Sequence, residues 1–68
     1  MSREIRVNGR AEPLTVTTVA ELLSIRGIAG GRGLAVAVNG VVVPAGAWRE
    51  RPLAAGDDVE IVRPFGGG

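Results

Sequence analysis

Two Asn-Gly dipeptides, Asn8-Gly9 and Asn39-Gly40, constrain the fold of this chain more than any other feature. A two-residue hairpin turn needs φ > 0 at both central positions, and asparagine and glycine tolerate that conformation. Residues 3–8 alternate apolar and polar side chains before the first dipeptide, and residues 34–38 form an apolar run before the second. The sequence therefore predicts two β-hairpins.

A different pattern occupies the segment between these hairpins. Residues 11–17 still alternate, and Pro13 places that strand at a sheet edge because proline cannot donate a ladder hydrogen bond. Thr18 and Glu21 then fit a capping box, which marks the start of a helix. Gly27 is a plausible stop for that helix. Its expected buried stripe consists of Val19, Leu22 and Leu23.

Arg26 interrupts this apolar stripe in the last turn of the helix. We expect its aliphatic stem to cover apolar surface while its guanidinium reaches water or the C-terminus of the helix.

The second half of the chain predicts three further strands. Residues 34–38 are apolar enough for a strand buried on both faces, residues 41–43 follow the turn, and residues 59–63 form the last strand. A short helical turn over residues 45–51 carries Trp48, which we expect to anchor the core. One helix against these strands predicts an α+β fold, a mixed sheet packed on one main helix.

Composition excludes several classes of function. Cysteine, histidine and lysine are absent, which removes thiolate chemistry, the usual general base and a lysine nucleophile. The formal net charge is +1 without a concentrated basic face, so we expect no nucleic-acid partner. The glycines of residues 27–33 follow a helix, the reverse of a phosphate-binding loop. We expect no metal, no membrane association and a cytoplasmic location.

The chain stops on three glycines, Gly66, Gly67 and Gly68. Glycine lacks a Cβ and enters narrow channels that other residues cannot enter. A glycine arm of this kind suggests that the terminal carboxylate is the reactive group and that another protein takes it into an active site. The alternative is an idle, frayed terminus.

These features together resemble the ThiS-type sulfur carriers of thiamine biosynthesis. The resemblance is carried by Val38-Asn39-Gly40, Val43-Pro44, Trp48, residues 56–61 and the terminal Gly67-Gly68. It implies a β-grasp (ubiquitin-like) fold, in which the last strand lies beside the first. The implied division is a β-grasp domain over residues 1–64 and a glycine tail over residues 65–68.

The resemblance also implies a function in which Gly68 carries the reactive carboxylate. A ThiF-like adenylyltransferase would use ATP to activate it, a cysteine desulfurase would supply sulfur, and a ThiG-like thiazole synthase would take that sulfur from a thiocarboxylate. The chain would be a protein co-substrate with no catalytic residue and no bound cofactor. Gly66 and Gly67 would be recognised in the tail, although the family motif requires only two glycines.

Partner contacts are expected where the last strand ends, at Val62, Arg63 and Phe65, although Phe65 also fits a role in closing the core. Other functions stay open. The lead-in over residues 63–65 is similar to that of the molybdopterin synthase small subunit, so the sulfur could serve that pathway or amino-acid biosynthesis. A ubiquitin-like protein modifier and a binding module with an idle tail are the remaining alternatives.

Overall fold

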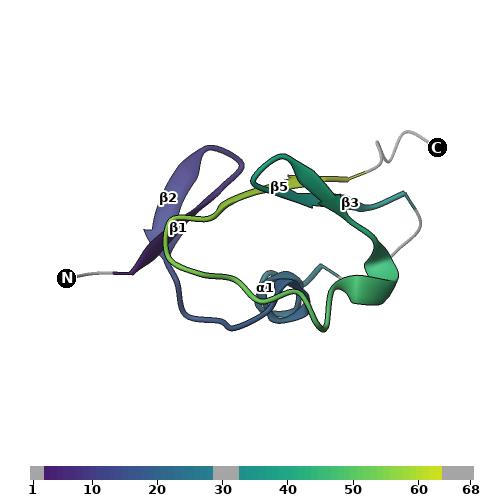
Figure 1. The fold of residues 1–68 in the computed structure, drawn as a ribbon, viewed down its shortest axis with the longest axis horizontal. Helices are drawn as coiled ribbons and strands as arrows, with labels where there is room; N and C mark the ends of the chain where they lie inside the picture. The colour runs from purple at the N-terminus through teal and green to yellow at the C-terminus, as the bar shows by residue number, and fades with distance from the viewer. Residues whose placement is uncertain (1–2, 29–32, 64–68) are drawn as a thin grey trace.

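A mixed sheet packs against one α-helix in the computed structural model, which describes residues 3–28 and 33–63 (Figure 1). In chain order the elements are β1 (Glu4–Val7), β2 (Arg10–Pro13), α1 (Val19–Ile25), β3 (Ala35–Val38), β4 (Val41–Val43), the 3₁₀ turn η1 (Ala45–Ala47) and β5 (Asp58–Val62).

The sheet has the strand order β2-β1-β5-β3-β4, so the last strand in the sequence is the central one. Strands β1 and β5 are parallel, whereas the other neighbouring pairs are antiparallel. This arrangement confirms the predicted mixed sheet on one helix, with the last strand beside the first. It also places β2 at a sheet edge, as Pro13 indicated.

Both predicted hairpins are present. Asn8 and Gly9 have φ values of 52° and 85°, and Asn39 and Gly40 have φ values of 53° and 82°. These positive values at both turn positions explain why an Asn-Gly pair suits each hairpin.

The N-terminus of α1 is capped by Thr18, whose Oγ1 accepts a hydrogen bond from the Glu21 amide at 3.2 Å. The Glu21 carboxylate turns back to Thr17 rather than to Thr18, which differs from the expected capping box. Its Oε1 accepts from the Thr17 amide at 2.7 Å and from the Thr17 hydroxyl at 2.8 Å. Thr17 draws the carboxylate because it offers two donors to one oxygen.

Gly27 terminates α1, as predicted: it follows the C-cap residue Arg26 and has a φ of 72°. The Gly27 amide donates to the Ser24 carbonyl at 3.0 Å and the Ile28 amide donates to the Leu23 carbonyl at 2.9 Å, which is a Schellman motif.

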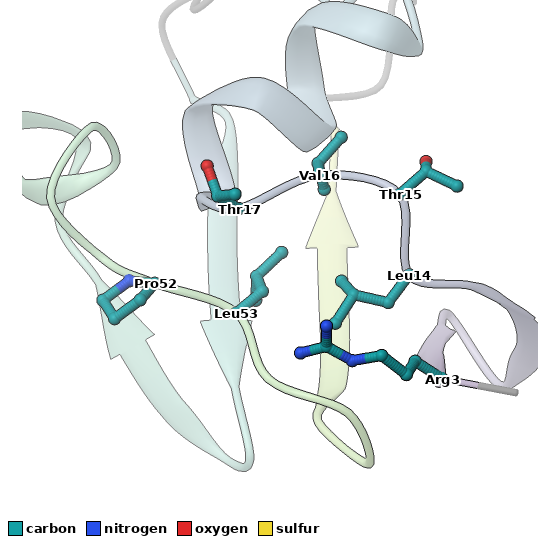
Figure 2. Close-up of a pocket in the computed structure, with 7 residues that line it drawn as sticks. All are labelled: Arg3, Leu14, Thr15, Val16, Thr17, Pro52 and Leu53. Carbon is teal, nitrogen blue, oxygen red and sulfur yellow. The ribbon is translucent and has the colours of Figure 1, made fainter. Parts of the chain in front are cut away.

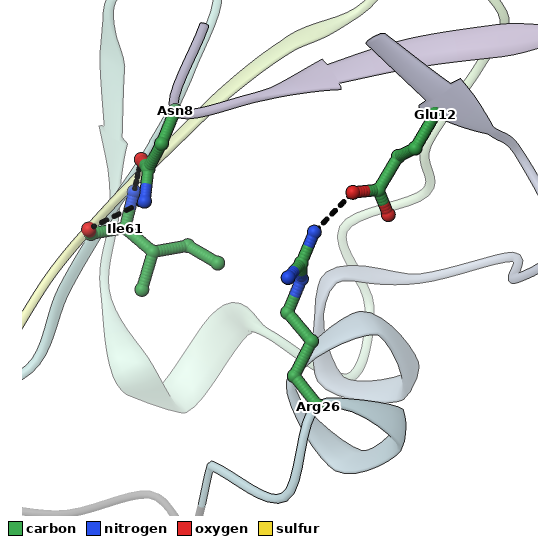
Figure 3. Close-up of polar contacts among 4 residues, drawn as sticks. All are labelled: Asn8, Glu12, Arg26 and Ile61. Atoms are coloured by element: carbon green, nitrogen blue, oxygen red, sulfur yellow. Dashed lines mark hydrogen bonds and ion pairs between the residues drawn. The ribbon is translucent and has the colours of Figure 1, made fainter. Parts of the chain in front are cut away.

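Arg26 does not direct its charge to the end of the helix. Its guanidinium forms an ion pair with Glu12 of β2 (Figure 3). Both side chains are only partly exposed, and the pair joins the end of the helix to the edge strand.

The core lies between the inner face of the sheet and α1. Leu22 is 1% exposed, and Trp48 is buried with its Nε1 donating to the Val43 carbonyl at 2.8 Å, so Trp48 is the core anchor expected. The buried residues are Ile5, Val7, Val19, Leu22, Leu23, Val36, Val38, Val43, Trp48, Leu53, Val59 and Ile61.

Two expectations about strands were wrong. The predicted strand over residues 11–17 ends at Pro13, because the chain leaves the sheet after the Leu14 amide bonds the Arg3 carbonyl, at 2.9 Å, and turns toward the helix. The strand over residues 34–38 is buried on one face only, since α1 covers one side of the sheet and alanines occupy the other.

Truncating the core should be far more harmful than truncating the exposed side of the same helix. Leu22→Ala should lower the free energy of unfolding by about 2–5 kcal/mol, comparable with the whole stability of a domain this small. Ile25→Ala, at a residue 62% exposed, should change it by no more than about 0.5 kcal/mol. Urea unfolding of both variants measures this, and equal losses would contradict the described core.

Acid should remove the stabilisation that Glu21 provides. The hydrogen bonds from the Thr17 amide and hydroxyl lower the pKa of Glu21 below its usual 4.5. The stabilisation is therefore present above the unfolded-state pKa and is lost as pH falls through the lower folded-state value. Glu21→Gln should unfold at lower urea concentration than the parent at neutral pH, and this gap should close from about pH 5 downward. A gap that is independent of pH would contradict the assignment.

Candidate functional site

The candidate site is the end of β5, the central strand, from which the chain continues into its C-terminal tail. Val62 is the last residue of β5 and is 61% exposed, and Arg63 is exposed beside it. Both predicted contact residues therefore lie at the surface. The other predicted site residues, Phe65 and the glycines at 66–68, lie outside the described residues.

On one side, β5 extends past the end of β1. The two strands pair only at Arg6↔Asp58 and Val7↔Val59, after which β1 turns away at Asn8. The Asn8 amide still donates to the Val59 carbonyl at 2.9 Å. The backbone of β1 thus supports the first part of β5 but not its last residues.

The side chain of Asn8 continues this support (Figure 3). Its Oδ1 accepts a hydrogen bond from the Ile61 amide at 2.8 Å, and its Nδ2 donates to the Ile61 carbonyl at 3.3 Å. One carboxamide therefore replaces the backbone groups that a longer β1 would have offered. We call this pair of hydrogen bonds the Asn8 clamp.

On the other side, β3 pairs with β5 from Val38↔Val59 to Ala35↔Val62. Asn39, which follows β3, extends that ladder at the opposite end of β5: its amide donates to the Asp58 carbonyl at 2.7 Å and its Oδ1 accepts from the Asp58 amide at 2.9 Å. Its Nδ2 donates to Asp57 Oδ1 at 3.0 Å. Each Asn-Gly turn thus holds β5 by an asparagine side chain.

This second role of both asparagines was not predicted from the sequence. Their tolerance of positive φ explained their place in the turns, but glycine or aspartate would also provide that tolerance. A signal for the role was present, since asparagine occupies the first turn position in both hairpins, and among Asn, Asp and Gly only the Asn side chain both donates and accepts hydrogen bonds.

The outer face of the sheet, away from α1, carries an apolar patch near the tail. Along β3 and β5 the side chains alternate between the core and this face. The register places Ala35 beside Val62 and Ala37 beside Val42, which is 69% exposed. We call Ala35, Ala37, Val42 and Val62 the outer-face patch.

Charged side chains border this patch. Glu60 is exposed and lies opposite Ala37 in the register, and Arg63 follows Val62. Within residues 3–28 and 33–63 the one ion pair is Arg26–Glu12, so Glu60 and Arg63 have no salt-bridge partner in that part of the chain. An apolar centre with charged side chains at its rim is typical of a protein–protein interface.

A shallow groove of about 430 Å³ lies elsewhere, between residues 14–17 and residues 52–53 (Figure 2). Leu14, Leu53 and Arg3 are among the residues that line it. Because β1 and β5 are parallel and Arg3 precedes β1, the groove lies at the end of the sheet opposite the tail. The Thr17 hydroxyl, which belongs to this lining, donates to the Glu21 carboxylate at 2.8 Å, the contact already described at the start of α1.

Among the described residues, no group of three acidic, histidine or cysteine side chains could hold a metal ion. None of the helices in that part of the chain has the length and hydrophobicity to cross a membrane.

Known proteins share the sequence pattern and the fold of this chain. Residues 5–68 match the ThiS family. A solved structure of thiamine biosynthesis protein ThiS from Geobacter metallireducens is 31% identical, covers 96% of this chain and 99% of its own, and superimposes with a TM-score of 0.78. No curated protein sequence matched the chain. The fold is therefore the β-grasp fold of that structure.

Proposed function

Because the chain belongs to the ThiS family, we propose that it is a sulfur carrier of thiamine biosynthesis whose C-terminal carboxylate is converted to a thiocarboxylate. The observation that carries this proposal is the extent of the family match. It runs from residue 5 to residue 68, so it includes the β-grasp body and the terminal glycines together.

The proposed chemistry takes place at the Gly68 carboxylate. A ThiF-like adenylyltransferase joins a carboxylate oxygen to the α-phosphorus of ATP, and pyrophosphate leaves. A persulfide from a cysteine desulfurase then attacks the carbonyl carbon and AMP leaves. Reduction of the resulting acyl disulfide by a thiol releases the thiocarboxylate. A ThiG-like thiazole synthase receives the sulfur.

In this scheme the chain supplies placement and its partners supply the catalytic groups. Gly66 and Gly67 have no side chains, so they suit a narrow channel that leads to the adenylating site. A shift of about 1 Å at the reacting carboxylate would cost on the order of 100-fold in rate. The carrier therefore needs a stable body at a fixed position beside each partner.

The outer-face patch is the surface that we assign to this docking. It lies at the end of β5 that leads to the tail, and Val62, Arg63 and Phe65 follow one another closely in the sequence there. The alanines at 35 and 37 leave space between Val42 and Val62 for an apolar side chain of the partner. Glu60 at the border would attract a basic residue.

The first test is the intact mass of the chain after incubation with a ThiF-type enzyme, ATP, cysteine and a desulfurase. We expect a gain equal to the exchange of one oxygen for sulfur, and no gain after deletion of both Gly67 and Gly68, because a single glycine then remains at the terminus. No gain in the parent chain would contradict the proposal if the same mixture thiolates a known ThiS protein. Conjugates with amines would indicate a protein modifier instead.

The second test places a charge on the outer-face patch. Val62→Glu should weaken binding to the adenylating enzyme at least tenfold, because a carboxylate would be buried against apolar surface. Ala11→Glu is the matched control, since residue 11 is exposed on β2, away from the patch, and the charge change is the same. Titration calorimetry measures both, and equal affinities for the two variants would remove Val62 from the interface.

A further inference from the structure

Few contacts hold the C-terminal end of β5, where the chain leaves the sheet. On the β3 side the last pairing is Ala35↔Val62, at the first residue of β3. On the β1 side the backbone pairing has already ended at Val7↔Val59. The Asn8 clamp is what holds Ile61 there, two residues before Arg63.

We propose that Asn8 is a positioning residue that fixes the direction in which the C-terminal tail leaves the sheet. This inference rests on the proposed function, because it concerns delivery of the Gly68 carboxylate. Asn8 lies 53 positions from Ile61 in the sequence, so the clamp joins the first hairpin to the segment that carries the tail.

The two hydrogen bonds of the Asn8 clamp are partly buried, so water cannot easily replace them. The Ile61 side chain is 8% exposed in the core. A backbone amide and carbonyl that lose their partners in such a place are not fully compensated by water. Without the clamp, the end of β5 would be paired on the β3 side alone. The backbone of residues 61–63 would then adopt a wider range of conformations.

Asn39 provides an internal control. It has the same residue type, the same Gly neighbour and nearly the same φ as Asn8, and it also bonds the β5 backbone. Its contacts are to Asp57 and Asp58, at the start of β5 and away from the tail. Loss of the Asn39 side chain should weaken the fold without altering the exit of the chain.

The test compares Asn8→Gly with Asn39→Gly. Glycine adopts positive φ readily, so both hairpins should still form. Hydrogen exchange of the Ile61 amide should be faster in Asn8→Gly and nearly unchanged in Asn39→Gly. Asn8→Asp should be intermediate, because its carboxylate keeps the acceptor for the Ile61 amide and loses the donor.

Kinetics of pyrophosphate release with a ThiF-type enzyme then separate positioning from stability. If one residue that the clamp had ordered must instead be ordered during the reaction, the entropy of fixing its backbone lowers the rate by roughly fivefold to thirtyfold. We expect Asn8→Gly to lose about tenfold in kcat with little change in KM, because the outer-face patch still docks. Asn39→Gly should keep the parent kcat, and Asn8→Asp should recover part of the loss.

Three results would overturn the inference: equal kcat losses in the two glycine variants, an unchanged kcat in Asn8→Gly, or unchanged exchange at Ile61. A parent chain that the enzyme does not adenylate would instead refute the proposed function, and with it any role of Asn8 in delivery. The exchange measurement would still report whether the clamp holds β5.

Discussion

The parallel pairing of β1 with β5 is the contact on which the rest of the structure depends. It joins residues 6 and 7 to residues 58 and 59, so it brings the two halves of the sequence into one sheet. Strand β5 becomes the central strand, with a hairpin on each side. The same pairing sets the point at which β1 stops and at which Asn8 must continue the support of β5.

The two faces of the central strand β5 differ in their surroundings. Val59 and Ile61 point into the core against α1, whereas Glu60 and Val62 point to the outer face. The core is therefore stabilised on one side of β5, and the other side is open to solvent. This separation suits the docking that we propose for the outer-face patch, because that surface contributes little to the core.

Local signals in the sequence predicted much of this fold. The Asn-Gly turns, the Thr18 cap, the Gly27 stop and the Trp48 anchor each follow from chemistry within a few residues. The contacts that were missed join distant residues: Arg26 with Glu12, and Asn8 with Ile61. Local patterns cannot reveal such partners. The open outer face of β3 was missed because the alanines at 35 and 37 count as apolar whether they are buried or exposed.

The central claim is that this chain gives sulfur from its terminus to thiazole formation. The most direct measurement follows radiolabelled sulfur from the thiocarboxylate chain, isolated and then mixed with thiazole synthase and its small-molecule substrates. The account predicts that label appears in the thiazole product in proportion to the carrier consumed. Label that stays on the chain, or that passes only to a molybdopterin precursor when molybdopterin synthase large subunit is supplied, would contradict it.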